Sequence, residues 1–398
     1  MTPEKAPTYI SRLTPPGQAA LATFGVFGSR AWEIARTLIR RFSGEELPDV
    51  PNAGRFWFGR IGGEIADEVV VALKRTEPIP LVEVHAHGGR EVARFLVDLF
   101  SAQGARVCSW RDYVWLTEAD TLSAEAAIAL AQATTLRTAS ILLDQHRGAL
   151  GDALADVLVA LENGKSATAE EMLDRLLRYA SVGEHLTKPW RVVVAGAPNV
   201  GKSSLVNALA GYQRSIVAAT PGTTRDVVTT SIALDGWTIA LSDTAGLRPE
   251  ADALEAEGIE RARTTMADAD LCLWILDASS PPVWPSEPHS SVLLVVNKID
   301  LAPIWHNEGE AIAISARTGQ GLNELCEAVV SRLVPDPPPP GASVPFAPHL
   351  SASIASARRS LAAGEIEAGK SQLAALLRGD PRSPSPPVLR RRGVAVGG

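Results

Sequence analysis

The sequence predicts an α/β fold in which an α/β domain, with a mostly parallel sheet and helices on both faces, is inserted in an α-helical domain. A small α/β domain precedes both. Three observations predict this arrangement. Between 189 and 336, short β-branched runs alternate with helical stretches, as in a parallel sheet with crossover helices. Segments rich in Ala and Leu flank this block, with apolar residues at i, i+3 and i+4. In the first 118 residues, short apolar runs alternate with turn signals.

These patterns set the expected domain boundaries. We expect an N-terminal α/β domain at 1–118, with amphipathic helices at 32–42 and 90–100, and a first helical part at 119–188 with two or three helices. The inserted domain spans 189–336 and ends at a proline-rich linker. A shorter second helical part, with one or two helices, spans 342–379, and a disordered tail spans 380–398.

Composition excludes several classes of protein. The net charge is −7, so no global basic field exists to hold nucleic acid. No apolar run is long enough for a membrane-spanning helix, and the N-terminus shows no signal-peptide pattern. The three cysteines form no CxxC pair. We therefore expect a cytoplasmic protein without a membrane partner.

A phosphate-binding loop lies at 196–203, where GAPNVGKS fits the pattern GxxxxGK[ST]. It follows the strand-like run 191–196 and precedes a helix-like segment, which is the context the motif requires. Gly196 and Gly201 let backbone N–H groups wrap around phosphates, Lys202 reaches the β and γ oxygens, and the Ser203 hydroxyl suits Mg²⁺. The residues expected to contact nucleotide are Asn199, Val200, Gly201, Lys202, Ser203 and Ser204.

The motif NKID at 297–300 indicates guanine as the base. The Asp300 carboxylate can accept two hydrogen bonds from guanine N1–H and N2–H₂, whereas adenine would leave it unpaired. Asn297 and Lys298 would brace this loop and the base. Downstream lies Ser315-Ala316-Arg317, where a backbone N–H can donate to guanine O6. The inserted domain is therefore expected to bind GTP and GDP as a P-loop GTPase (G) domain.

Two segments have the character of nucleotide-dependent switches. Asp243, Thr244, Ala245 and Gly246 form a DxxG motif, in which Asp243 would hold Mg²⁺ through water and the Gly246 N–H would sense the γ-phosphate. The segment 220–226 supplies threonines for the other switch. Leu247 stands where Ras-like enzymes have the glutamine that orients water. An acidic residue of the second switch can take that role, the candidates being Glu250, Asp252, Glu255 and Glu257.

Together these motifs resemble the TrmE–Era–EngA branch of translation-linked GTPases, and within it the tRNA modification GTPase (MnmE/TrmE) family. The resemblance is carried by DTAGLR followed by EGIERAR, by TPGTTRD, and by TPPG and HAHGG near the N-terminus. It implies K⁺-stimulated hydrolysis of GTP to GDP and phosphate in the service of tRNA wobble-uridine modification. It also implies a homodimer that acts on tRNA with a flavin-dependent partner protein.

The resemblance assigns further residues. Asn199 would help bind K⁺ together with carbonyl groups near Ala218 and Thr220 and with Thr223, while Thr224 would be the Mg²⁺ threonine. Glu255 would orient the attacking water, so the predicted catalytic residues are Lys202, Gly246 and Glu255. The nucleotide site would extend over the first switch, to Ala218, Ala219, Thr220, Pro221, Gly222, Thr223 and Thr224.

Departures from the family leave alternatives open. No cysteine follows Cys326, whereas the family ends in CxGK. The segments that the family associates with one-carbon tetrahydrofolate are replaced, one of them by SWRDYVWLTEAD at 109–120. One alternative is a degenerate paralogue that acts as a regulatory or ribosome- or RNA-associated switch without modification chemistry. Another is a nucleotide-switched dimerisation device without RNA.

Four side chains outside the G domain are of types that can bind a metal or stack on a ligand. His85 and His87 lie two apart on an expected strand, so both face one way; a metal pair is one interpretation and a structural role the preferred one. Trp110 and Trp115 can stack on a ligand, although packing is the preferred interpretation.

Overall fold

The computed structural model describes residues 6–17, 19–212, 229–243, 269–285, 291–305 and 309–378. The predicted tail at 380–398 lies outside these ranges. The chain is an α/β protein that divides into two compact units, one running to Ile128 and one spanning Ala129–Leu377. None of the helices described in these ranges is both long and apolar enough to cross a bilayer.

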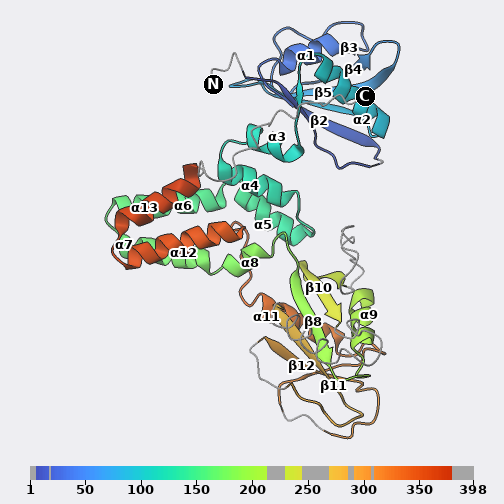
Figure 1. The fold of residues 1–398 in the computed structure, drawn as a ribbon, viewed down its shortest axis with the longest axis vertical. Helices are drawn as coiled ribbons and strands as arrows, with labels where there is room; N and C mark the ends of the chain where they lie inside the picture. The colour runs from blue at the N-terminus through green and yellow to red at the C-terminus, as the bar shows by residue number, and fades with distance from the viewer. Residues whose placement is uncertain are drawn as a thin grey trace, which may run out of the picture. The chain divides into compact units, whose positions relative to one another are not determined.

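The first unit is built on a seven-stranded sheet in the order β3-β4-β5-β6-β2-β1-β7 (Figure 1). Neighbouring strands are antiparallel except for the parallel pair β1 and β7. The strands are β1 (Tyr9–Arg12), β2 (Leu21–Phe27), β3 (Ile39–Arg41), β4 (Phe56–Gly62), β5 (Ala66–Arg75), β6 (Leu81–His87) and β7 (Arg106–Val107).

The core of the first unit lies on one face of this sheet. Phe24 and Val26 lie two residues apart on β2, so their side chains point to the same face of the sheet, and both are fully buried. They belong to a cluster with Trp32 of helix α1 (Ala31–Leu38) and Phe100 of helix α2 (Arg90–Ala102). Helix α3 (Trp110–Thr117) instead reaches the face that carries Gly25, where a Cβ would lie 2.3 Å from the Tyr113 ring.

The predicted helix at 32–42 is wrong in its second half. Helix α1 ends at Leu38, and Ile39, in extended conformation, starts strand β3. Ile39 is fully buried and pairs with Ile61 of β4. Tertiary pairing therefore overrides the amphipathic helical pattern at this point.

Five helices, rather than the two or three expected, follow α3 before the inserted domain. Gly148 and Gly164 interrupt the pattern with φ of 108° and 71°, values that favour glycine. The helices are α4 (Thr121–Leu130), α5 (Leu136–His146), α6 (Ala149–Glu162), α7 (Ser166–Leu177) and α8 (Ala180–Glu184).

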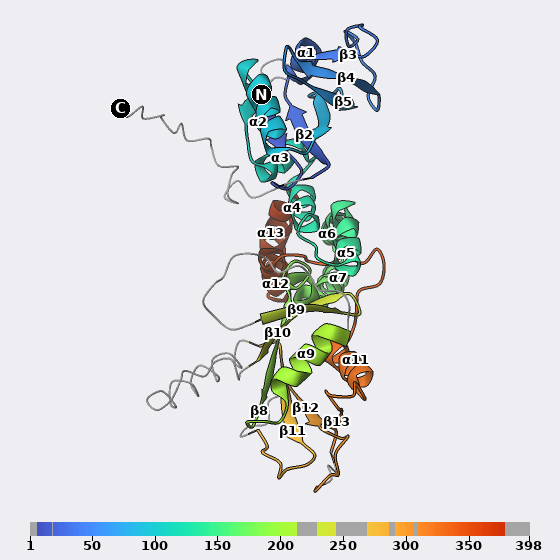
Figure 2. The same ribbon diagram turned by 90° about the vertical axis from the view of Figure 1, so that its right-hand side faces the viewer.

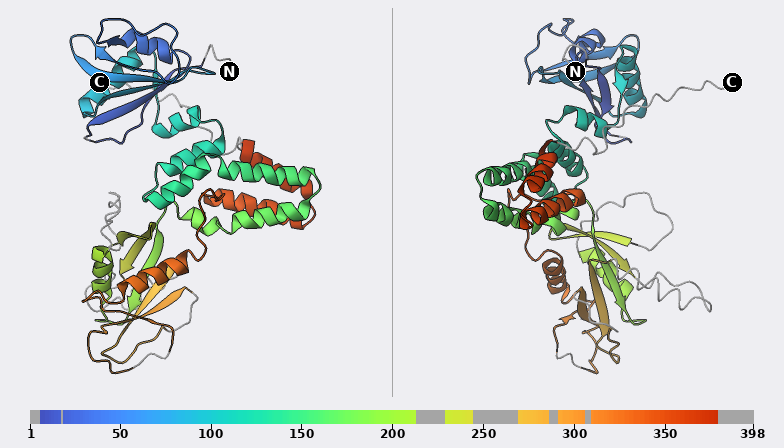
Figure 3. Two further views of the ribbon diagram at one scale, coloured as in Figure 1. Left: turned by 180° about the vertical axis from the view of Figure 1, so that it is seen from behind. Right: turned by 60° about the vertical axis from the view of Figure 1, so that its left-hand side comes forward.

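Helices from both sides of the inserted domain pack together in the second unit. The C-terminal pair, α12 (Pro348–Ala362) and α13 (Ile366–Arg378), lies beside α6 and α7 (Figure 3). Arg358 of α12 contacts two carboxylates of α7, donating from Nε to Asp174 at 2.9 Å and lying 2.8 Å from Glu170. The G domain is therefore an insertion in one helical domain.

The inserted domain has a six-stranded sheet in the order β13-β12-β11-β8-β10-β9 (Figure 2). All neighbours are parallel except the hairpin β9–β10. Helices α9 (Lys202–Tyr212) and α11 (Leu322–Leu333) pack against it. The strands are β8 (Trp190–Gly196), β9 (Thr229–Leu234), β10 (Trp237–Asp243), β11 (Leu271–Asp277), β12 (Val292–Asn297) and β13 (Ile312–Ala313).

The β9–β10 hairpin is fastened to the start of helix α5. Thr135 donates from Oγ1 to the Gly236 carbonyl oxygen at 2.6 Å, and the hydroxyls of Thr134 and Thr238 are 2.6 Å apart. Arg137 lies 3.1 Å from the Asp235 carboxylate. The hairpin follows the segment predicted as the first switch and leads to the DxxG motif, so this contact ties the switch-bearing strands to the helical domain.

Candidate nucleotide-binding site

The phosphate loop connects β8 to α9 in a conformation that requires its glycines. Gly196 has φ of 138°, and a Cβ there would lie 2.5 Å from the Ile275 carbonyl oxygen. Gly201 has φ of 98°, and a Cβ there would lie 2.3 Å from Nδ2 of Asn297. A side chain at either glycine would therefore push the loop away from β11 and β12. The strand, loop and helix that the motif predicts are all present.

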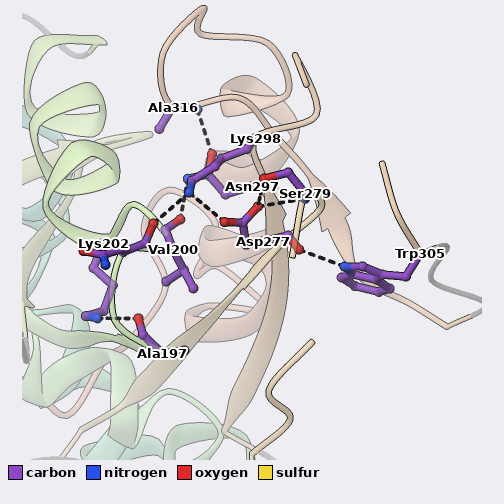
Figure 4. Close-up of polar contacts among 10 residues, drawn as sticks. Ala197, Val200, Lys202, Asp277, Ser279, Asn297, Lys298, Trp305 and Ala316 are labelled. Carbon is purple, nitrogen blue, oxygen red and sulfur yellow. Dashed lines mark hydrogen bonds and ion pairs between the residues drawn. The ribbon is translucent and has the colours of Figure 1, made fainter. Parts of the chain in front are cut away.

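Lys202 begins helix α9, and its ammonium group turns back toward the loop. Nζ donates to the Gly196 carbonyl oxygen at 3.1 Å. It also donates to the Ala197 carbonyl oxygen at 2.9 Å (Figure 4). The side chain is 8% exposed. Phosphate oxygens pair more strongly with an ammonium group than neutral carbonyls do, so this charge is well placed for a polyphosphate at the helix N-terminus.

Ser203 and Asp243, both predicted to serve Mg²⁺, lie together. The Ser203 hydroxyl donates to Oδ2 of Asp243 at 2.5 Å, joining the start of α9 to the end of β10. A hydroxyl beside a carboxylate is the oxygen-rich donor set that Mg²⁺ prefers. Ser204, the next residue on α9, is exposed.

Asn297 links the phosphate loop to the predicted guanine loop. Its Nδ2 donates to the Val200 carbonyl oxygen at 2.9 Å, and its Oδ1 accepts from the Ala316 N–H at 3.0 Å (Figure 4). The side chain is 2% exposed. A buried side chain with both ends hydrogen-bonded holds the three segments in one arrangement.

Lys298 adds a second link and involves a residue that sequence reasoning missed. Its Nζ donates to the Asn199 carbonyl oxygen at 2.7 Å and to Asp277 at 2.6 Å (Figure 4). Burial raises the pKa of the Asp277 carboxyl, but hydrogen bonds from Lys298 and Ser279 outweigh it, so the pKa lies below its usual value. Asp277 ends β11 at the sheet edge where Asp243 and Asn297 end their strands. This position at the end of a predicted strand was the feature of the sequence that could have pointed to Asp277.

The proposed base-recognition carboxylate, Asp300, already has two partners. Ser315 donates from its hydroxyl to Oδ1 at 2.5 Å, and Arg317 forms an ion pair with Oδ2. The hydrogen bond from Ser315, followed by the charge of Arg317, holds the pKa of the Asp300 carboxyl below its usual value. NKID and the Ser-Ala-Arg segment therefore meet, as their sequence spacing predicts.

Many predicted residues lie outside the described ranges. This is the case for the whole first-switch set, for the second-switch residues after Asp243, and for the proposed water-orienting glutamate. These residues are Ala218, Ala219, Thr220, Pro221, Gly222, Thr223, Thr224, Thr244, Ala245, Gly246 and Glu255.

The histidine pair has local protein partners. His85 Nδ1 lies 3.0 Å from the Thr23 hydroxyl, and His87 Nδ1 lies 2.6 Å from Asp67. The described ranges contain no group of three or more His, Cys, Asp or Glu residues arranged to hold a metal. Burial raises the pKa of the thiols of Cys108, Cys272 and Cys326 to about 11, which disfavours thiolate chemistry.

The chain is similar to known GTPases over most of its length. The family model "50S ribosome-binding GTPase" matches residues 191–303. A tRNA modification GTPase MnmE of Thermus thermophilus is 33% identical over 356 residues, which cover 81% of each chain. That of Thermotoga maritima is 32% identical over 369 residues, again 81% of each chain. Among solved structures, the G domain of the T. maritima FeoB iron transporter is 28% identical over 36% of this chain and 98% of its own, with a TM-score of 0.27.

Proposed function

Because the chain belongs to the family of tRNA modification GTPases named MnmE, we propose that it binds GTP, hydrolyses it to GDP and phosphate, and serves tRNA modification. The observation that carries the choice of GTP is the Asp300 carboxylate. It lies on a loop that Asn297 fastens to the phosphate loop, so one ligand can reach both. The two carboxylate oxygens can accept the N1–H and N2–H₂ donors of guanine, whereas adenine offers no such pair of donors at that edge.

The phosphate end of the site supports Mg²⁺-dependent hydrolysis. The donor set of Ser203 and Asp243 fits Mg²⁺, and Thr224 is proposed as a further ligand. The metal, when bound, supplies charge that neutralises the phosphate oxygens. The chain itself supplies the Lys202 ammonium group for those oxygens and the N-terminus of α9 behind them.

We propose K⁺ as a second cation, which stabilises negative charge that develops during hydrolysis. The proposal rests on the family resemblance and on Asn199, whose φ of 62° is an unusual conformation for a residue with a side chain. Ala218, Thr220 and Thr223 are the other proposed ligands. Steady-state hydrolysis in K⁺ should exceed that in Na⁺ at equal ionic strength, and Asn199→Ala should remove the difference. Equal rates in the two salts would contradict the proposal.

Leu247 cannot orient water through hydrogen bonds, so we propose that Glu255 does so. Glu255→Gln should lower kcat for GTP hydrolysis while the GDP affinity is retained. The neighbouring Glu257→Gln variant is the matched control, because it removes the same charge two residues away. If both variants hydrolyse GTP at the wild-type rate, another residue orients the water.

We propose that the first unit takes no tetrahydrofolate at the segment that the family associates with it. In this chain that segment contains helix α3, and its Tyr113 ring lies where a Cβ on Gly25 would be. The Tyr113 hydroxyl is itself buried and has no hydrogen-bond partner among the described residues. This part of the sheet face is filled by the protein, and we assign no folate-dependent step to the chain.

For the biological role we propose a homodimer that acts on the wobble uridine of tRNA with a flavin-dependent partner protein. The match to MnmE proteins over 81% of both chains supports this role over that of a regulatory switch without chemistry. Nucleoside mass spectrometry of bulk tRNA should show loss of the modified wobble uridine when the gene is deleted in a strain without a second copy. Unchanged nucleosides would instead support the regulatory alternative.

A further inference from the structure

Asp300, the carboxylate proposed to recognise the base, forms an ion pair with Arg317. The Asp300 side chain is 12% exposed, whereas that of Arg317 is 72% exposed. Arg317 therefore reaches the carboxylate from the solvent side, while Ser315 holds the other oxygen from within the protein. A base that approaches from solvent meets the guanidinium group before it meets the carboxylate.

The two competing groups are chemically alike. The guanine ring contains a guanidine unit, made of N1, N2 and N3 around C2, and its N1–H and N2–H₂ groups form the edge that a carboxylate recognises. The arginine side chain ends in the same planar arrangement of N–H donors. Arg317 can thus satisfy Asp300 as guanine would, and a bound guanine must take its place.

We propose that Arg317 is an internal competitor for guanine at Asp300, and so a residue that sets nucleotide affinity and association rate. This inference rests on the proposed function, because it presumes that the site binds guanine nucleotides. The pocket is competent only in the fraction of molecules whose Arg317 has left the carboxylate. The apparent dissociation constant is then the intrinsic one divided by that fraction.

The loop around the ion pair is otherwise held firmly, so release of the arginine need not disturb it. The Ser315 N–H donates to the Gln320 carbonyl oxygen at 2.9 Å, and the Gly319 N–H donates to the Ser315 carbonyl oxygen at 2.9 Å. The Ala316 N–H is held by Asn297. Exchange between arginine and guanine therefore requires movement of one exposed side chain and not of the backbone.

The test is stopped-flow association of the fluorescent nucleotide mant-GDP with the full chain at about 0.3 M salt, where long-range charge effects are screened. Arg317→Ala should raise the association rate constant about 3- to 10-fold, as expected when a minor competent state becomes dominant. Arg332→Ala, an equal loss of charge on an exposed position at the far end of α11, should leave it unchanged. An unchanged or lower rate constant in Arg317→Ala would overturn the proposal.

A double-mutant cycle tests whether the effect passes through Asp300. In the Asp300→Asn background, mant-XDP is the probe, and the additional Arg317→Ala change should leave its association rate unchanged. An equal acceleration in both backgrounds would overturn the proposal, because Arg317 would then act elsewhere. If the wild-type chain binds no mant-GDP, the proposed function itself fails. If the wild-type chain binds mant-GDP and Arg317→Ala does not accelerate the association, only the proposal about Arg317 fails.

Discussion

The side-chain amide of Asn297 donates to the Val200 carbonyl oxygen at 2.9 Å, across 97 residues of sequence. Through this bond, the strand that precedes the proposed base-recognition loop is attached to the proposed phosphate-binding loop. The other end of the same amide accepts from the Ala316 N–H. The two proposed subsites therefore share one buried group, the Asn297 side chain.

Asn297→Ala should weaken both the fold of the G domain and its affinity for nucleotide. It leaves the buried Val200 carbonyl and the part-buried Ala316 N–H without their partner, at a cost of about 2 to 4 kcal/mol in unfolding free energy. The dissociation constant for GDP should rise at least ~10-fold. Urea unfolding and GDP titration check the two effects. Asn323→Ala, on the exposed side of α11, is the control, and equal behaviour of the two variants would contradict the bridging role.

Asp300→Asn should change the preferred base. The amide can no longer accept both guanine donors, so GTP affinity should fall about 100-fold. Xanthine carries a carbonyl group at C2, to which the new amide can donate, so XTP should bind better than GTP. Competition binding against mant-GDP and mant-XDP measures the preference. Asp336→Asn, at an exposed carboxylate of the same domain, should retain the preference for GTP; retention in Asp300→Asn would refute the assignment.

Thr135→Val should loosen the contact between helix α5 and the β9–β10 hairpin. The change keeps the side-chain shape but removes the donor to the Gly236 carbonyl oxygen and also the cap that accepts from the Thr138 N–H, at an expected cost of about 1 to 3 kcal/mol in unfolding free energy. Urea unfolding of the full chain checks this, with the exposed Thr168→Val on α7 as the matched control. Identical unfolding curves for the two variants would show that the contact contributes nothing to stability.

His185 should make the stability of the second unit fall at acidic pH. Its ring stacks on Trp190 with centroids 3.7 Å apart, and burial lowers the pKa of the imidazole below its usual value. Between that lowered pKa and about 6.5, the unfolded chain binds the proton more strongly than the folded chain does. Stability should therefore be fully present above pH 6.5 and decline as pH falls below it, by at most about 1.4 kcal/mol per pH unit.

His185→Phe keeps a ring beside Trp190 but has no proton to bind. Its unfolding free energy should show a shallower decline between pH 6.5 and pH 5 than that of the wild type. Chemical unfolding at a series of pH values gives both slopes. Parallel slopes would mean that the pKa of His185 is not lowered by folding.

The parts of the fold that were predictable are those in which local pattern and tertiary role agree. The run RVVVAG predicts strand β8 because a buried parallel strand needs an unbroken apolar sequence. The motif GAPNVGKS predicts that a phosphate-binding loop follows this strand. Ile39 shows the opposite case. In the sequence it continues the helical pattern of α1. In the structure it lies on strand β3, where it pairs with Ile61 and is fully buried, and this pairing is not visible in the local sequence.

The site divides in the same way. The meeting of Asp300 and Asn297 with the Ser-Ala-Arg segment was predictable from the two motifs, and the role of these residues in guanine recognition stays a prediction. Asp277 and its link to Lys298 were not, because the contact depends on two strands ending at one sheet edge. The Arg317 contact with Asp300 was likewise hidden, since the sequence motif describes the ligand-bound role of Asp300 and not its partner in the free protein.

The most direct test of GTP hydrolysis is phosphate release from GTP by the full chain, with Mg²⁺ and K⁺ present, for the wild type, Lys202→Ala and the exposed-site control Lys165→Ala. The wild type and the control should hydrolyse GTP at similar rates. Lys202→Ala should be at least ~100-fold slower while its circular dichroism spectrum stays the same, because it removes the charge placed for the phosphates. Wild-type turnover by a folded Lys202→Ala protein would contradict the assignment of this site as the centre of hydrolysis.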